Sequence, residues 1–103
     1  MSYINIIKEN IPYKFDIRLN KLTYTMEINY NPDFDFFTVS VADSMGTVLT
    51  SGEKLVLNKE ILSTQSYVNF PTVKPLDVSG VEKEITWGNF GKTVLLYVGG
   101  VGE

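Results

Sequence analysis

Two neighbouring stretches of the chain alternate strictly between apolar and polar residues. Between residues 11 and 19 the apolar side chains occupy the odd positions, and between residues 22 and 30 they occupy the even positions. A period of two residues puts all the apolar side chains of a strand on one face, so each stretch is predicted to be a half-buried β-strand. Only Asn20 and Lys21 separate the stretches, which predicts a β-hairpin with a two-residue turn.

The register of this hairpin follows from the same pattern. With the turn at Asn20–Lys21, the numbers of paired residues add up to 41, and five apolar pairs face one another. The pairs are Ile11–Tyr30, Tyr13–Ile28, Phe15–Met26, Ile17–Tyr24 and Leu19–Leu22. A slip of one residue would set each apolar side chain opposite a polar one, so one register is expected. Lys21 replaces the glycine that the tightest turn prefers, which leaves the turn type open.

The length of the hairpin arms indicates the architecture. An arm of nine residues extends about 30 Å at roughly 3.3 Å per residue. A compact domain of 103 residues has a radius of gyration of only about 13 Å. The arms must therefore twist or bend around the core, and we expect an all-β fold: a small antiparallel β-barrel or a strongly twisted β-sandwich.

The rest of the chain is predicted to alternate short strands with turns. Turns are expected where asparagine, aspartate, proline and glycine cluster, at 31–35, 43–46 and 88–91. Strands are expected at 36–42, from residue 47 onward, at 85–87 and at 93–98. Gly46 suits a left-handed turn position, and Gly52 is expected to kink the chain.

Three further segments differ from this pattern. Pro71 and Pro75 restrict their segment to an edge strand or a loop, because proline cannot donate to a sheet ladder. Residues 58–66 lack strand character and could form one short helical turn. The run from 93 to 98 is apolar at nearly every position, which predicts a strand buried on both faces.

Length and composition predict one folded β domain over residues 1–103. Hydrophobic residues make up 44% of the chain and charged residues 20%, close to the globular average. Residues 1–10 are an N-terminal segment that lacks the pattern of a signal peptide, and 99–103 are expected to be a flexible, glycine-rich tail. The longest uncharged apolar stretch, 93–101, is far shorter than the roughly 20 residues needed to cross a bilayer. We expect synthesis in the cytoplasm and no membrane partner.

Charge and the missing residue types exclude several function classes. The net charge is −3 and the sequence pI is about 4.9, which argues against binding to duplex nucleic acid or an anionic membrane. The chain has no histidine and no cysteine, so histidine-based catalysis, thiolate nucleophiles and zinc–thiolate sites are excluded. We therefore expect no enzyme activity, no catalytic residues and no cofactor.

Two short motifs suggest ligand sites but are incomplete. Residues 91–93 match the end of a phosphate-binding loop, yet Thr86 stands where the first glycine is required, and a strand rather than a helix is predicted to follow. Asp33 and Asp35, with Asp43 one hairpin away, could offer carboxylate oxygens to Ca²⁺ or Mg²⁺. A complete site needs six or more oxygens, so a solvated turn is favoured and no metal is expected.

Aromatic residues at the predicted turns are the candidates for partner contacts. The candidates are Phe34, Phe36, Trp87 and Phe90, because large apolar side chains at loop positions are typical of protein interfaces. One alternative is a module that binds a small ligand or carbohydrate in an aromatic groove. A third is an oligonucleotide-binding barrel, which needs a positive groove, whereas acidic residues outnumber lysines around this cluster.

The order of strands, prolines and glycines from about residue 11 to residue 98 matches a known pattern. Its features are Ile11-Pro12-Tyr13, Leu19-Asn20, Tyr30-Asn31-Pro32, Asp35-Phe36-Phe37, Gly46, Gly52, Leu55-Val56-Leu57, Pro75-Leu76-Asp77 and a closing strand beyond Trp87. This order resembles the small baseplate plug proteins of contractile-tailed bacteriophages and prophages.

The resemblance implies a non-enzymatic structural role in a tail baseplate, where the protein plugs or connects the central hub near the tube end and the spike. It implies other baseplate or hub proteins as partners, with a homo-oligomer as a further option, and a location in the virion tail after synthesis in the bacterial host. It carries over no catalytic, cofactor-binding or metal-binding residue.

Overall fold

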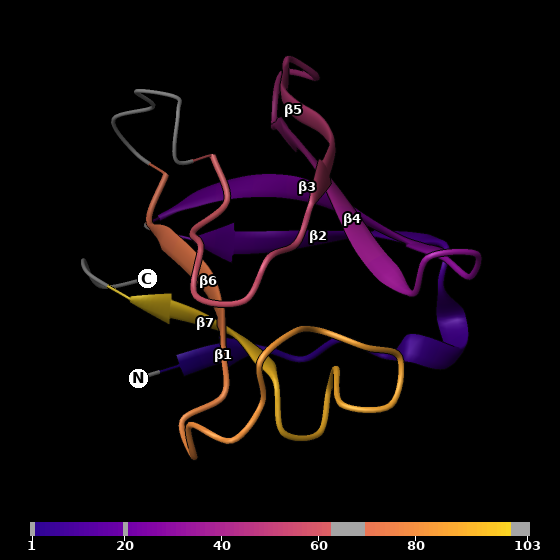
Figure 1. Ribbon diagram of the computed structural model, residues 1–103. Coiled ribbons are helices and arrows are strands. Elements are labelled where there is room, and N and C mark those ends of the chain that lie inside the picture. The colour runs from indigo at the N-terminus through magenta and orange to yellow at the C-terminus, as the bar shows by residue number, and fades with distance from the viewer. Residues whose placement is uncertain (1, 20, 63–69, 100–103) are drawn as a thin grey trace.

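The computed structural model describes residues 2–19, 21–62 and 70–99 (Figure 1). Within these residues the chain forms seven β-strands and one 3-10 turn. They are β1 (Ser2–Ile4), η1 (Lys8–Asn10), β2 (Tyr13–Leu19), β3 (Leu22–Asn31), β4 (Phe36–Asp43), β5 (Val48–Lys54), β6 (Thr72–Leu76) and β7 (Leu95–Gly99).

The strands form two antiparallel sheets. One sheet has the order β2-β3-β4-β5 and the other has the order β1-β7-β6. Figure 1 shows them as two layers, with the long strands of the first sheet above the short strands of the second. The all-β prediction is therefore confirmed, and of its two forms the described strands make the sandwich rather than a closed barrel.

The hairpin of β2 and β3 has the register that its alternation predicts. The pairing runs from Tyr13 with Ile28 to Leu19 with Leu22, and every pair adds up to 41. The fifth predicted pair, Ile11 with Tyr30, lies outside this ladder because β2 begins at Tyr13. Ile11 instead ends η1, where its N–H donates to the carbonyl of Lys8 over 3.1 Å.

The core lies between the two sheets. The first sheet contributes the buried side chains of Met26, Ile28, Val39 and Val41, and the second contributes Val73, Leu96 and Val98. Removing one such side chain from water stabilises a fold by about 1.5–3 kcal/mol. The alternation of β3 puts Tyr24, Met26 and Ile28 into this core, whereas Leu22 beside the turn is exposed.

Several turn and edge predictions are also confirmed. Residues 32–35 form a turn, and Gly46 has the expected positive φ of 86°. Gly52 has a φ of 64° inside β5, beside the register shifts between β4 and β5. β6 contains Pro75 and is an edge strand of its sheet.

The predicted strand at residues 85–87 is wrong. Two backbone groups that a sheet ladder would use are taken by side chains: the Thr86 N–H donates to Asn89 Oδ1 over 2.8 Å, and the Trp87 N–H donates to Asp35 Oδ1 over 2.9 Å. The segment is consequently part of a loop held by side chains.

The helical turn expected within residues 58–66 is also absent from the part that the structure describes, residues 58–62. Asn58 and Leu62 have positive φ values of 68° and 59°, which a right-handed helix does not allow. The N–H groups of Asn58 and Ile61 donate to carbonyls of β6 over 2.8 and 2.9 Å, so this segment follows the edge of β6. Residues 63–66 lie outside the described residues.

The two ends of the chain differ from expectation as well. Residues Ser2–Ile4 form β1, a strand missed in the N-terminal segment, and it pairs with β7. β7 is fully buried on one face only: Leu96 and Val98 are buried, whereas Leu95 and Tyr97 are half-buried. Gly99 is the last residue of β7, and the rest of the predicted flexible tail, residues 100–103, lies outside the described residues.

Candidate interaction site

The turn between β3 and β4 is built by one asparagine. The side-chain oxygen of Asn31 accepts hydrogen bonds from the N–H groups of Asp33 and Phe34, over 2.9 and 3.2 Å. Asparagine readily caps a turn in this way. The turn holds the ring of Phe34 in solvent, with 77% of the residue exposed.

A second asparagine organises the loop that precedes β7. Asn89 is only 8% exposed; its side chain accepts from the Thr86 N–H over 2.8 Å and donates to the Glu84 carbonyl over 2.9 Å. Its backbone carbonyl accepts from the N–H groups of residues 92, 93 and 94. Asn89 therefore holds the part of this loop between residues 84 and 94.

Asp35 joins the turn to the loop. Its Oδ1 accepts a hydrogen bond from the Tyr30 hydroxyl over 2.7 Å and another from the Trp87 N–H over 2.9 Å. The bond from Tyr30 and then the bond from Trp87 hold the pKa of Asp35 below its ordinary value, although partial burial opposes them. The same bond to Asp35 raises the pKa of Tyr30. Both shifts favour the charged carboxylate and the neutral phenol, the pair that this link requires.

Trp87 lies on an aromatic cluster at this end of the sandwich. Its ring stacks on Phe37 at an interplanar angle of 11° and lies 4.8 Å from the Tyr30 ring. The Lys8 ammonium is 5.1 Å from the centre of the Trp87 ring and also donates to the Trp87 carbonyl. Trp87 nevertheless remains 39% exposed, so the cluster holds it in place at the surface.

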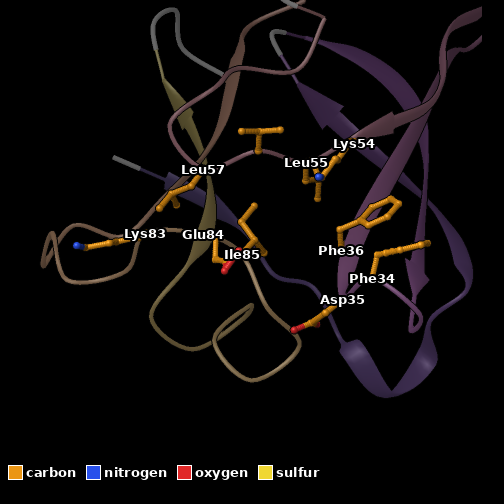
Figure 2. A pocket seen from close by; sticks show the side chains of 10 residues that line it. Phe34, Asp35, Phe36, Lys54, Leu55, Leu57, Lys83, Glu84 and Ile85 are labelled. Carbon is orange, nitrogen blue, oxygen red and sulfur yellow. The ribbon is translucent and has the colours of Figure 1, made fainter.

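A cleft of about 160 Å³ opens beside the turn. Figure 2 shows Phe34, Phe36 and Lys54 on one side of it and Leu57 and Lys83 on the other. The Lys54 ammonium lies 4.9 Å from the centre of the Phe36 ring, a cation–π arrangement that fixes both side chains. The cleft has room for about one large side chain of a partner.

Three of the four predicted contact residues lie at least partly at the surface, and the fourth is buried. Phe34 and Trp87 are exposed and Phe36 is half-buried, and we call these three residues the end surface. Phe90 is only 1% exposed, so its prediction as a surface contact is wrong. The loop built by Asn89 turns the Phe90 ring inward, 4.5 Å from the Phe37 ring.

The residues that build this site were not recognised from the sequence. The sequence suggests Asp35 as a possible metal ligand and places Asn89 in a turn, and neither pattern predicts the hydrogen bonds that build the site. A polar residue at the start of a turn is a signal for side-chain capping, but which distant backbone Asp35 reaches depends on the fold.

The two motifs that suggested ligand sites contain residues that form turns in the structure. Asp43 accepts from the N–H groups of Met45 and Thr47 and so closes its own hairpin turn. In residues 2–19, 21–62 and 70–99 there is no group of three acidic residues that could hold a metal ion. Residues 91–93 form a turn that leads into β7 rather than into a helix.

Fold and site together define a class: a small all-β sandwich whose exposed aromatic residues are held in place by side-chain-to-backbone hydrogen bonds. None of the helices in the described residues is long and apolar enough to span a membrane.

A comparison with protein families identifies the class more closely. A family model described as cyanophage baseplate Pam3 plug gp18 matches residues 1–101 of the chain. The chain belongs to this family of phage baseplate plugs, and the resemblance inferred from residues 11–98 is confirmed. The family description names a structural part of a phage tail. No match was found among curated proteins.

Proposed function

We propose that this protein is a non-enzymatic structural component of a phage or prophage tail baseplate. It plugs or connects the central hub near the tube end and the spike, and it contacts other baseplate or hub proteins through its end surface. It acts as a single β domain that is made in the cytoplasm of the bacterial host and assembled into the virion.

The observation that carries the proposal is the link at Asp35. It joins the Phe34 turn to the Trp87 loop, 52 residues further along the chain, and so holds together the two backbone segments that carry these exposed aromatic residues. Interface hot spots are enriched in large side chains of this kind. Surfaces that are ordered before binding lose less conformational entropy when they associate.

The use of the acidic residues supports a non-enzymatic role. Asp77 accepts hydrogen bonds from Ser79 and from the N–H groups of Val81 and Glu82, and these bonds lower its pKa. The pKa of Asp35 is likewise lowered, by the hydrogen bonds that it accepts from Tyr30 and Trp87. General acid–base catalysis near neutral pH instead favours carboxyl groups with raised pKa values.

The two alternatives are less well supported. The cleft of about 160 Å³ is smaller than the roughly 300–1,000 Å³ of most small-ligand sites. A hollow of about 390 Å³ beside Tyr30, Asp33 and Phe36 reaches this range, but it is wide open to solvent, whereas small-ligand sites enclose most of the ligand. The oligonucleotide-binding alternative relied on a barrel, and the described strands form a sandwich instead.

Replacing Phe34 by serine tests the proposal. Wild-type and variant chains are co-produced in cells that assemble the tail, and their ratio in purified tails is measured by mass spectrometry. A hot spot worth about 2 kcal/mol predicts roughly 30-fold exclusion of Phe34→Ser from the tails.

Met45→Ser is the matched control, because Met45 is another exposed apolar side chain, 87% exposed, on the β4–β5 hairpin. We expect it to enter tails as the wild type does. Equal incorporation of Phe34→Ser and wild type would refute the end surface as the contact, and absence of the wild-type chain from tails would refute the baseplate role.

A further inference from the structure

The outer faces of the two sheets differ in chemistry. In β2 and β3 the outward positions carry charged and polar side chains such as Lys14, Asp16, Thr23 and Glu27. In the β1-β7-β6 sheet the side chains opposite to the buried set are mostly apolar. We call this second set the outer sheet face: Tyr3, Thr72, Lys74, Leu76, Leu95 and Tyr97.

Pairing across the strands makes this face continuous. Tyr3 is paired with Tyr97, which is paired with Lys74 on its other side, and Leu95 is paired with Leu76. The rings of Tyr3 and Tyr97 meet edge to face with their centres 6.0 Å apart. Tyr3 is 53% exposed, so an ordered aromatic pair faces solvent at the centre of the face.

A small hollow extends the face at one end. It has a volume of about 140 Å³, and Tyr3, Asn5, Lys92 and Leu95 are among the residues that line it. The exposed lining of the hollow is mainly polar, and Lys92 is an exposed residue beside it.

The charge of this face is opposite to that of the whole chain. The net charge of the protein is −3, yet the charged residues on the outer sheet face and around its hollow are Lys74 and Lys92. Two of the three acidic residues of the neighbouring loop accept hydrogen bonds within that loop: Asp77 accepts from residues 79, 81 and 82, and Glu82 accepts from the Thr93 hydroxyl.

We infer that the outer sheet face is a second docking surface, and that its occupant is an apolar patch of a different protein with acidic side chains opposite Lys74 and Lys92. Charge complementarity indicates this kind of partner, because an apolar contact that buries ammonium groups needs carboxylates to pair with them. A second copy of the outer sheet face would bring its own lysines, and none of the residues that define this face carries a carboxylate to pair with them. With the end surface, the protein can hold two neighbours at once.

The inference is tested on purified tails, in which the proposed function places the protein. A carbodiimide couples a lysine directly to a carboxylate that touches it, and mass spectrometry then identifies the joined residues. We expect Lys74 or Lys92 to be joined to an aspartate or glutamate of another protein. Lys59, exposed on the segment after β5, is the control and should form no such link.

Hydroxyl-radical oxidation measures coverage of the same face. In the isolated chain, Tyr3 should react readily and Tyr24, only 4% exposed, should not. In tails, the reactivity of Tyr3 should fall to that of Tyr24. Tyr3 that stays reactive in tails, together with uncoupled Lys74 and Lys92, would overturn the inference, and coupling to a second copy of this chain would overturn the choice of occupant.

Charge reversal gives an independent readout. Lys74→Glu should enter tails about tenfold less well than the wild type, the effect of about 1.4 kcal/mol, while Lys59→Glu should be neutral. Thermal unfolding of both variants checks that they fold, and equal incorporation of folded Lys74→Glu would contradict the inference. If the chain is missing from tails, the proposed function fails, and the coupling and oxidation measurements are then made on intact producing cells to decide the present inference.

Discussion

The hairpin of β2 and β3 and the loop between β6 and β7 represent two ways of holding a backbone in place. In the hairpin, seven consecutive residue pairs repeat one interaction, and the alternate side chains of β3 enter the core. In the loop, the path depends on a few polar side chains, chiefly Asp77 and Asn89, and on Asp35 from the turn after β3. Many equivalent interactions therefore stabilise the hairpin, whereas a few side-chain hydrogen bonds stabilise the loop.

The difference explains where the contact residues lie. The hydrogen-bond ladder of a hairpin holds all of its residues in the same way, and its side chains point alternately to the two faces of the sheet. Individual hydrogen bonds let the loop turn Phe90 into the core and leave Trp87 at the surface, three positions apart. The following predictions test this comparison, beginning with the largest expected effect.

Met26→Ala should destabilise the whole fold. Met26 is completely buried in the middle of β3, and truncation of such a side chain leaves a cavity that costs about 2–5 kcal/mol. Urea unfolding measures the change. Thr23→Ala, on the exposed side of the same strand, should change stability by less than about 0.5 kcal/mol. Similar losses in the two variants would show that the inner face is not what stabilises the hairpin.

Asn89→Ala should destabilise the loop between β6 and β7. It leaves the Thr86 N–H and the Glu84 carbonyl without their partner, which costs about 1–3 kcal/mol when such groups are buried. Trp87 is the only tryptophan in the chain, so its fluorescence reports on the loop while urea unfolding reports on the whole fold.

Asn89→Asp is the informative companion, because it keeps the acceptor for Thr86 and loses the donor to Glu84. We expect a smaller loss than for alanine. A native fluorescence spectrum and unchanged stability in Asn89→Ala would mean that the interactions stabilising the loop are spread over many residues, as they are in the hairpin.

Lys21→Gly should stabilise the hairpin at an unfavourable position of its turn. Lys21 has a φ of 68°, a left-handed conformation that costs a residue with a side chain about 1–2 kcal/mol. Glycine relieves this strain but loses more backbone entropy on folding, so the expected net gain is about 0.5–1 kcal/mol. Lys21→Ala keeps the strain and should bring no gain. A loss of stability in Lys21→Gly would show that the lysine side chain itself stabilises the turn.

Acid should loosen the loop before it affects the hairpin. The pKa of Asp35 lies below its ordinary value of 3.8 because the Tyr30 hydroxyl and the Trp87 N–H bond to the carboxylate. Such a group contributes its full stabilisation above the unfolded pKa and loses it as the pH falls through the folded pKa. The emission of Trp87 should therefore change below pH 3.8 while the hairpin circular dichroism persists.

Asp35→Asn is the test of this assignment. The amide cannot titrate, so the variant should lose the acid-dependent change in Trp87 emission, whereas Asp33→Asn in the same turn should keep it. A transition that is the same in all three proteins would assign the effect to another group.

The same contrast decides what could be predicted from the sequence. The hairpin register was predictable because every pair from Tyr13–Ile28 onward obeys one local rule. β1 was missed because three residues show no period, and its partner β7 lies more than ninety positions further on. Residues 85–87 alternate like a strand, but Asn89 and Asp35 take the backbone donors of Thr86 and Trp87.

The candidate site was predictable only as a set of residue types. Phe34 and Phe90 are both aromatic residues at turns, yet one is 77% exposed and the other 1% exposed. Nothing local distinguishes them, because the burial of Phe90 depends on Phe37 in β4. The bond from Trp87 to Asp35 likewise needs the folded chain to bring the two together.

The central position of β7 has a consequence for how the protein is made. β7 (Leu95–Gly99) lies between β1 and β6 and is the strand to which each of them pairs. During synthesis, the first sheet can form once residue 54 has emerged, whereas β1 waits unpaired for residues 95–99. Pairing over so long a sequence separation is slow, so we expect β1 to pair late in folding. Cleavage before residue 95 would remove the pairing of an entire sheet rather than of one strand.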